Sequence, residues 1–435
     1  MAVPAPGSQR EIRRRNLSRV LYSVAEHGPS SRASAAARLG LTRTAVSTLV
    51  DELLRGGLLA EQGPESPGGG PGRPGTALAL TDSGPCGLGA EIGVDHLSAC
   101  AVDLRGQVRA HIRVESRSRD SSSEAVLGRL GALVEEVASA ARAVELRPSG
   151  LGVAVPGLVA RGTSTVVHAP NLGWHDIDIA PVLAQAVNKT QAGPPGRGAG
   201  LPDAGAGFLE AKAARAAPAP SLTVDNEANL AALAELWRGG ARMPRDFVHV
   251  SAEVGIGAAV VLDGELLCGS RGFAGELGHT PVRPDGPRCA CGGQGCLEQY
   301  AGERAILRAS GIKEAGSREA GSRETALAAL AERAASGEPQ ALRALGGAGE
   351  ALGIALAGTV NLLDPGAVVL GGTLARFAPW LLPSLKEQLT CRTAAPGSLP
   401  ELLVSQLGAE GPLLGAAHTA VRAVLDDPPA YAMRR

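Results

Sequence analysis

Three cysteines stand close together in the segment RCACGGQGCLEQY, residues 288–300, in a chain that has seven cysteines in all. Their spacing is C-x-C-x4-C, at Cys289, Cys291 and Cys296. A tetrahedral zinc ion needs a fourth ligand, and His279 lies ten residues before the first cysteine. One imidazole and three thiolates form a closed zinc set, and the glycines among them let the backbone wrap around an ion. The segment therefore predicts a structural zinc site.

The spacing alone leaves other uses of these thiols open. A redox pair more typically has C-x-x-C spacing, and a catalytic cysteine needs one thiolate beside a histidine base. Unligated core cysteines are the third alternative. The chain has no stretch of eighteen apolar residues, and its N-terminus MAVPAPGSQREIRRR lacks the apolar segment of a secretory signal. We therefore expect a cytoplasmic protein with no membrane partner, in which thiols stay reduced and favour metal over disulfides.

The first eighty residues carry ten arginines and six acidic residues, whereas the whole chain has a net charge of −1. A basic end on a nearly neutral chain indicates a module that binds nucleic acid. Apolar residues at helical spacing predict helices in NLSRVLYSVAEHG, in SRASAAARLG and in TRTAVSTLVDELLRGG, where Thr42 is the expected N-cap. This order predicts a helix-turn-helix whose third helix enters the major groove of DNA.

The outer face of the third helix has small polar and basic side chains, as a DNA reader needs. After it, LLAEQ and TALALT predict two short strands, and GPESPGGGPGRPG between them predicts the tip of a wing that contacts phosphate or the minor groove. A small helical domain that binds a protein is the alternative. The candidate DNA-contacting residues are Arg43, Thr44, Ser47, Thr48 and, near the wing tip, Arg73.

From about residue 86 onward, strands and helices alternate, which is typical of α/β proteins. Residues 122–144 predict a helix, and GLGVAVPGLV predicts a buried strand that runs into a turn. A second α/β unit starts near residue 221. The segment 312–338 predicts a helical excursion on the surface. Two lobes with a cleft between them are the expected body, and a cleft is where a small ligand binds.

The segment GFAGELGHTPV followed by CACGGQGCLEQYAG resembles the signature of the ROK family, the repressors and sugar kinases that share one actin-like kinase fold. VAVPGLV, APNLGWHDIDI, DNEANLAALAE and AVVLGGTLA match in the family's order, so the resemblance covers about residues 86–435. It implies an α/β protein with an N-terminal winged helix-turn-helix and the two-lobed ROK sugar-kinase fold. The expected parts are residues 1–82 for the DNA-binding domain, 83–187 for the first lobe, 188–220 for a flexible Gly/Ala/Pro-rich insertion, 221–411 for the second lobe with the zinc motif, and 412–435 for a C-terminal helix that packs back on the first lobe.

The resemblance also implies a sugar in the cleft. The family's E-x-G-H motif falls on Glu276 and His279, its C-L-E glutamate on Glu298, and its N-D-A-N on residues 226–229. The NLGW loop would place Asn171 and Trp174 beside the same cleft. Carboxylate, amide and imidazole groups grip pairs of sugar hydroxyls through hydrogen bonds. The implied sugar contacts are Asn171, Asn226, Glu227, Glu276, His279 and Glu298, and the implied ligands of a structural Zn²⁺ are His279, Cys289, Cys291 and Cys296.

The sequence departs from the family's kinases at the residues that handle phosphate. Glu227 occupies the position of the catalytic aspartate, and its extra methylene moves the carboxylate by about 1 Å, which is enough to cost roughly 100-fold in rate. The family's D-x-G-G-T reads EIGVD at 91–95, and G-T-G-I-G-G reads AEVGIGA at 252–258. Asp95 and Glu253 place negative charge where a phosphate would lie. We therefore assign no catalytic residue; an active sugar kinase that carries a DNA reader is the alternative.

These features lead to one hypothesis for function. We expect a sugar-responsive transcriptional regulator, a repressor, that binds operator DNA as a homodimer or tetramer. A sugar or sugar phosphate would be the effector. A body that senses a protein partner, such as a transporter component, is a third possibility.

Overall fold

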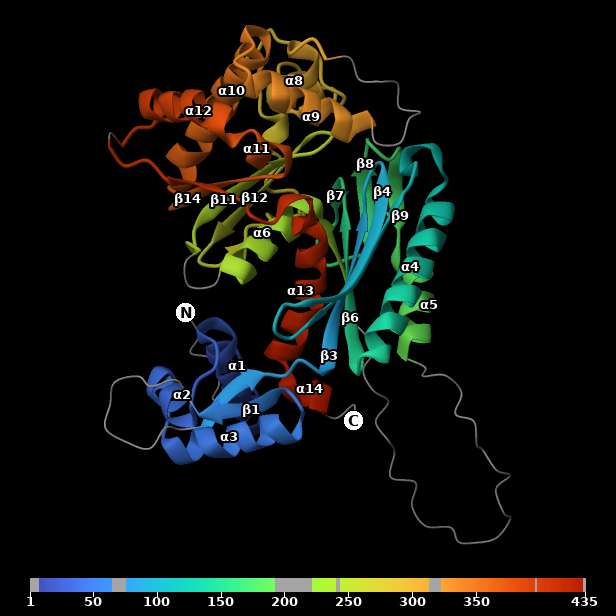
Figure 1. The fold of residues 1–435 in the computed structure, drawn as a ribbon, viewed down its shortest axis with the longest axis vertical. Helices are drawn as coiled ribbons and strands as arrows, with labels where there is room; N and C mark the ends of the chain where they lie inside the picture. The colour runs from blue at the N-terminus through green and yellow to red at the C-terminus, as the bar shows by residue number, and fades with distance from the viewer. Residues whose placement is uncertain are drawn as a thin grey trace, which may run out of the picture.

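The structure is a computed structural model that describes residues 8–64, 76–191, 221–239, 243–312, 322–395 and 397–432. Arg73 and most of the expected 188–220 insertion lie outside the described residues. Figure 1 shows the chain arranged as a small N-terminal part beside two larger lobes. Among the described helices, none combines the length and apolar composition needed to cross a bilayer.

The N-terminal part forms where the apolar spacing predicts it. Thr42 is the N-cap of the third helix and accepts a hydrogen bond from the Ala45 amide, and Gly40 ends the second helix in the left-handed conformation. The first helix begins earlier than expected, because Ser8 supplies an N-cap. The two strands pair in an antiparallel hairpin, as a wing requires. The elements are α1 (Gln9–His27), α2 (Arg32–Leu39), α3 (Arg43–Arg55), β1 (Leu59–Pro64) and β2 (Thr76–Leu80).

The first lobe is a mixed sheet with strand order β10-β6-β3-β4-β5 and with helices on both faces. β3 pairs in parallel with β6 and antiparallel with β4. A small sheet, β7-β8-β9, extends from the end of β6. The elements are β3 (Gly84–Ile92), β4 (His96–Asp103), β5 (Val108–Glu115), η1 (Ser118–Asp120), α4 (Ser123–Ala143), β6 (Leu146–Val155), β7 (Leu158–Val159), β8 (Thr165–Ala169), β9 (Trp174–Asp178), α5 (Ala180–Gln191) and β10 (Ser221–Asn226).

The second lobe repeats this plan with strand order β13-β12-β11-β14-β15. β11 pairs antiparallel with β12 and in parallel with β14. The elements of this lobe are α6 (Glu227–Gly239), β11 (Phe247–Ala252), β12 (Ile256–Leu262), β13 (Glu265–Leu266), η3 (Leu277–His279), α7 (Glu298–Ala301), α8 (Glu303–Ala309), α9 (Ser322–Ala335), α10 (Pro339–Leu363), β14 (Ala367–Gly371), α11 (Gly372–Arg376), α12 (Ala378–Arg392), β15 (Glu401–Val404) and η4 (Gly408–Glu410). Two further helices, α13 (Gly411–Asp426) and α14 (Pro428–Ala432), follow it and pack outside this lobe's sheet.

One expectation for this lobe was wrong. The described part of segment 312–338 is not a surface excursion, because α9 packs on α8 and α10 and buries Leu327, Leu330 and Ala334. These residues stand at helical spacing, so the pattern was visible in the sequence.

α13 connects the parts of the molecule. It packs on β3, β4 and β6 of the first lobe and on α6 (Figure 1). Glycines make this close approach possible: a Cβ at Gly89 would lie 2.5 Å from the Leu413 carbonyl oxygen, and one at Gly152 would overlap the Ala416 carbonyl. At its far end, Val421 and Val424 share one hydrophobic cluster with α1 and α3. The N-terminal part is therefore packed against the body and is not merely tethered to it.

Candidate metal and ligand site

His279, Cys289, Cys291 and Cys296 come together in one cluster, with their ligand atoms all within 4.8 Å of one another. The Cys291 and Cys296 sulfurs are 3.8 Å apart, and Nδ1 of His279 is 3.7 Å from the Cys289 sulfur. A tetrahedral zinc ion with Zn–S bonds of about 2.3 Å holds its sulfurs roughly 3.8 Å apart. The four side chains therefore fit a zinc site of the kind that the spacing predicts.

The loop that carries these cysteines has little regular structure of its own. The Cys289 amide donates to the Gly293 carbonyl at 2.9 Å, and the Gly293 amide donates to the Cys291 sulfur at 3.4 Å. Gly295 adopts a positive φ of 70°. The amides of Gly292 and Gly295 donate to the carbonyls of Cys289 and Pro287, so backbone bonds already shape this loop. A metal ion would add a cross-link between the loop and His279 and would hold the residues that follow it, including Glu298.

Glu276, Glu298 and Asn171 lie next to the cluster. A Glu276 carboxylate oxygen is 3.6 Å from Nε2 of His279, which leaves Nδ1 of that ring facing the cysteines. Glu298 begins α7 and accepts a hydrogen bond of 3.2 Å from the Ile256 amide. A Cβ at Gly255 would overlap the Glu298 carboxylate and would lie 3.9 Å from Nδ2 of Asn171. The structure thus brings these three polar side chains to one edge of the cleft.

The start of α6 supplies the next polar groups. Asn226 caps this helix: its Oδ1 accepts from the Ala228 amide, and its Nδ2 donates to the Gly157 carbonyl, both at 2.8 Å. Asn229, which is 5 % exposed, donates to Asp225 at 2.8 Å. The side-chain amide of Asn226 thus has protein partners on both its nitrogen and its oxygen. Glu227 follows directly, and burial together with the negative charge of Glu253 raises its pKa well above the usual range.

The positions expected to hold phosphate carry charged side chains. Glu91 is 2 % exposed, and the His96 ring contacts both Glu91 at 3.4 Å and Asp95 at 2.8 Å. Burial alone lowers the pKa of His96, but these two carboxylates raise it to about 9. The hydrogen bond from His96 lowers the pKa of Asp95 to about 2. Burial and the negative charge of Glu91 raise the pKa of Glu253 to about 7.

The sequence reasoning missed an arginine that reaches this charged cluster from the other lobe. Arg323, near the start of α9, binds Glu303 through two hydrogen bonds of 2.7 and 2.9 Å and lies 3.7 Å from Asp95. Thr373 donates to the same Glu303 carboxylate at 2.7 Å. Asp95 belongs to the first lobe and Arg323 to the second, so this chain of ion pairs joins the two lobes. No motif marks Arg323; only its place at the start of the amphipathic helix α9 could have drawn attention to it.

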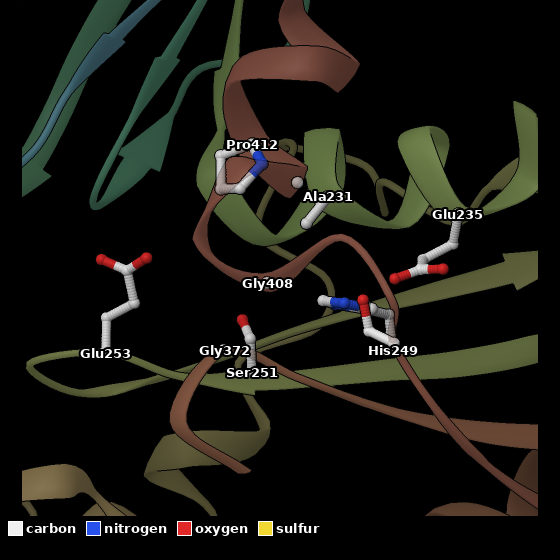
Figure 2. Close-up of a pocket in the computed structure, with 10 residues that line it drawn as sticks. Ala231, Glu235, His249, Ser251, Glu253, Gly372, Gly408 and Pro412 are labelled. Carbon is white, nitrogen blue, oxygen red and sulfur yellow. The ribbon is translucent and has the colours of Figure 1, made fainter. Parts of the chain in front are cut away.

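A small cavity borders Glu253. A cavity of about 10 Å³ lies between α6, β11 and the start of α13, and it has room for about one water molecule. Figure 2 shows Glu253 on one side of this cavity and Glu235 with His249 on the other. Burial lowers the pKa of His249 to about 4, so the ring is neutral at physiological pH.

Two sequence expectations about side-chain position have clear outcomes. Trp174 does not line the cleft: it is 4 % exposed and packs in the core of the first lobe, since its ring is too apolar to stay in solvent. On α3, the first turn is open to solvent at Arg43, Thr44 and Thr48, and Ser47 is half-buried. The helix therefore presents the face that the sequence singled out, while Val46 and Leu49 point into the core.

Comparison with known proteins agrees with this architecture. The ROK family pattern matches residues 87–192 and 216–423. The chain is 27 % identical to the xylose repressor of Bacillus spizizenii over 418 residues, which is 95 % of this chain and 97 % of that protein. It is 28 % identical to the glucokinase of Streptomyces coelicolor over 346 residues, 77 % of this chain and 96 % of that one. The repressor similarity thus includes the N-terminal part, and the kinase similarity does not.

Solved structures show the same fold. A ROK family transcriptional regulator, described as a homolog of the E. coli MLC protein, superimposes with a TM-score of 0.72 at 24 % identity, covering 97 % of this chain and 99 % of the regulator. A ROK family glucokinase from Streptomyces griseus in complex with glucose and AMPPNP gives 0.59 at 24 % identity, covering 77 % and 98 %. The expected α/β class and two-lobed kinase-like body with an N-terminal helical region are confirmed. With the family pattern matching most of its length, this chain belongs to the ROK family.

Proposed function

We propose that this chain is a sugar-responsive transcriptional repressor that binds operator DNA through its N-terminal part as a homo-oligomer with paired readers. One observation carries the proposal. The cleft keeps hydrogen-bonding groups beside the zinc cluster, but Glu91, Asp95 and Glu253 occupy its phosphate side. Such a cleft suits a ligand without phosphate and does not suit ATP. The nearly full-length similarity to xylose repressors supports the same function.

The sugar would lie between the zinc loop and the start of α6. Glu276 and His279 on one side and Glu227 on the other supply donors and acceptors for adjacent hydroxyls. Glu298 and Asn171, which meet at Gly255, would complete the contacts. A zinc ion at the four-residue cluster would keep this edge rigid, so that little order has to be gained when the sugar binds.

The reader would place α3 in the major groove, with Arg43, Thr44, Ser47 and Thr48 near the base edges. Two readers related by twofold symmetry match a palindromic operator. A sugar can release the DNA only if it binds more tightly to the arrangement whose readers do not fit both half-sites.

A DNA shift assay tests the proposal directly. The purified protein is titrated onto the DNA upstream of its own gene, with and without D-xylose, D-glucose or N-acetylglucosamine. We expect specific binding that one of these sugars weakens. Absence of sequence-specific binding would refute the regulator, and specific binding that no sugar or other small metabolite changes would refute the sugar response.

A substitution within α3 tests the reading face. Arg43→Ala should weaken operator binding by about 1–3 kcal/mol if the guanidinium contacts a base. Arg55→Ala, at the other end of the same helix, is the matched control and should leave operator affinity nearly unchanged. Equal losses of operator affinity in both variants would show that Arg43 contributes only positive charge and does not recognise a base.

An active sugar kinase is the second candidate, favoured by the similarity to glucokinases over the body. Its difficulty is the negative charge of Asp95 and Glu253 at the positions expected to hold phosphate, which disfavours a bound nucleotide. Release of ADP from ATP in the presence of the same sugars separates the two functions.

A further inference from the structure

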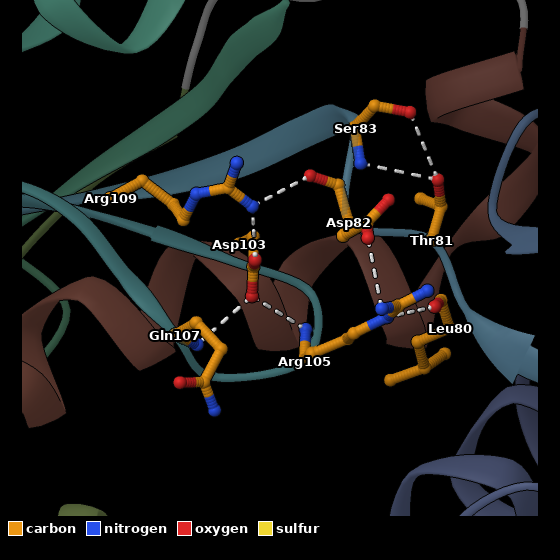
Figure 3. A network of polar contacts seen from close by, with 8 residues as sticks. All are labelled: Leu80, Thr81, Asp82, Ser83, Asp103, Arg105, Gln107 and Arg109. Atoms are coloured by element: carbon orange, nitrogen blue, oxygen red, sulfur yellow. Dashed lines mark hydrogen bonds and ion pairs between the residues drawn. The ribbon is translucent and has the colours of Figure 1, made fainter. Parts of the chain in front are cut away.

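Three consecutive residues, Leu104, Arg105 and Gly106, form the turn between β4 and β5 and touch different parts of the molecule. Leu104 is 1 % exposed and belongs to the hydrophobic cluster of the N-terminal reader, with Leu80 and Leu58. Arg105 donates from Nε to the Leu80 carbonyl at 2.6 Å and from Nη1 to the Asp82 carboxylate at 2.9 Å (Figure 3). This turn, which belongs to the body, therefore binds the segment that connects β2 of the reader to the body.

A buried carboxylate keeps this turn in shape. Asp103, whose side chain is 1 % exposed, accepts hydrogen bonds of 2.9 Å from the amides of Arg105 and Gln107. Its other oxygen accepts from Arg109 at 3.1 Å, and the same guanidinium donates to the Asp82 carbonyl at 3.1 Å (Figure 3). With both carboxylate oxygens engaged, the turn and the reader's linker move as one unit.

The third residue of the turn rests on the end of α6. Gly106 has a φ of +80°, and a Cβ on it would lie 2.7 Å from the Trp237 ring, so only glycine fits. Arg238 donates to the Gly106 carbonyl at 3.1 Å. Trp237 in turn stacks on His418 of α13, with ring centroids 4.2 Å apart. The last turn of α6 is therefore held against the residues that hold the reader.

The first turn of α6 lies in the proposed sugar site, at Glu227 and next to Asn226. The helix has thirteen residues, which at 1.5 Å per residue makes a rod of about 20 Å. An α-helix of this length is stiff, so a shift or tilt at its first turn appears at its last turn. A single element thus has one end at the ligand cleft and the other end at the reader's anchor.

We propose that Trp237 and Arg238, acting through the Leu104–Gly106 turn, are the positioning residues by which ligand in the cleft sets the orientation of the DNA reader. This inference rests on the proposed function. It assigns coupling, not sugar binding or base reading, to these residues. Because binding free energies are linked, the factor by which sugar weakens operator binding must equal the factor by which operator weakens sugar binding.

The test measures that factor in the full-length protein. Operator affinity is determined with and without saturating D-xylose, D-glucose or N-acetylglucosamine, and sugar affinity is determined by calorimetry with and without operator. Coupling factors are typically about 5–150-fold. In Arg105→Ala and Arg238→Ala we expect the factor to fall to less than about twofold, while sugar affinity without DNA stays at the wild-type value.

Control variants separate coupling from general damage. Trp237→Phe keeps an aromatic ring against Gly106 and should retain most of the coupling, whereas Trp237→Ala should lose it. Arg245→Ala removes an exposed arginine that pairs with Asp263 elsewhere on the body, and it should leave the factor unchanged. Wild-type coupling in Arg105→Ala and Arg238→Ala, or a coupling loss matched by an equal loss of sugar affinity, overturns the inference.

A second measurement tests the coupling without a sugar, in case none of the three sugars affects operator binding. Operator DNA alone should change the hydrogen-exchange protection of the first turn of α6 in the wild type and not in Arg105→Ala. A wild type that binds no DNA refutes the proposed function itself. A wild type and a variant that respond alike refute only the coupling path.

Discussion

The side that holds the Cys/His cluster and the side expected to hold phosphate differ in how their carboxylates are paired. On the zinc side, His279 and Glu276 lie 3.6 Å apart with Glu276 open to solvent, so its carboxylate remains available to a ligand. On the phosphate side, Asp95 and Glu303 are already paired, with His96 and with Arg323. The exposed Glu276 carboxylate can still accept further hydrogen bonds, whereas Asp95 and Glu303 are tied up in ion pairs within the protein.

This difference is what the proposed sensor function requires of the fold. A kinase needs both sides, since sugar and nucleotide must meet in line. A regulator needs only differential binding of one ligand. An ion-pair chain that crosses from Asp95 to Arg323 can take over the bridging of the lobes that a nucleotide provides in an enzyme.

Loss of the metal should have the largest effect. Cys291→Ser removes one of four zinc ligands and should abolish zinc binding and destabilise the body by more than about 3 kcal/mol, since zinc contributes about 10–16 kcal/mol in small zinc peptides. Native mass spectrometry and thermal unfolding measure the two losses. Cys391→Ser, at an exposed cysteine outside the cluster, is the control. Full zinc content in Cys291→Ser would contradict the site.

The ion pairs of His96 on the phosphate side should make the stability of the fold depend on pH. The pKa of His96 is raised to about 9, so its pairing stabilises the fold below the unfolded-state pKa of about 6.5, and this contribution is lost as the pH rises through 9. The loss is at most roughly 3 kcal/mol. Urea unfolding at several pH values should show this decline near pH 9 in the wild type and not in His96→Gln.

Neighbouring groups affect the same profile. Glu91, Asp95 and the more distant Arg113 act on His96 directly. Glu253, whose pKa is raised to about 7, opposes folding increasingly as the pH rises from about 4.5 to 7, so it lowers stability in an earlier window. Glu253→Gln should remove that earlier decline only. A His96→Gln profile identical to that of the wild type would show that the ion-pair chain does not form.

Sugar affinity should depend on one side of the cleft. Glu276→Gln removes the charge from a proposed hydroxyl contact and should weaken sugar binding by about 1.5–3 kcal/mol, while operator binding without sugar is retained. Glu253→Gln makes the same chemical change on the phosphate side and should leave sugar affinity nearly unchanged. Calorimetry with the sugar that acts in the DNA assay measures both. Equal losses of sugar affinity in the two variants would show that the sugar does not bind on one side only.

The smallest expected effect is on phosphoryl transfer. Glu227→Asp restores the family's aspartate but leaves Asp95 and Glu253 in place, so no measurable ADP formation should appear in either the wild type or this variant. A coupled assay with glucose, N-acetylglucosamine and xylose checks this, with added glucokinase as the positive control. A turnover near one per second would contradict this prediction and show that the protein is an active sugar kinase.

The sequence analysis succeeded where the interacting residues lie close together in the chain and failed where they lie far apart. The four metal-site residues lie within eighteen positions of one another, so their spacing alone predicted the cluster. The faces of α3 were predicted equally well, because helical periodicity is local. Trp174 was misplaced, since a motif position says nothing about which way an indole ring turns.

The sequence by itself determined the Cys/His cluster, the exposed face of α3, the α/β alternation and the acidic residues in the segments 91–95 and 252–258. Only the tertiary structure decided that Asp95 of the first segment meets Arg323, and that Arg323 and Thr373 share the Glu303 carboxylate, across long stretches of chain. It also decided that α6 joins the cleft to the Leu104–Gly106 turn. Such contacts depend on how whole elements pack, and no spacing within a segment records which distant side chain will lie within a few ångströms.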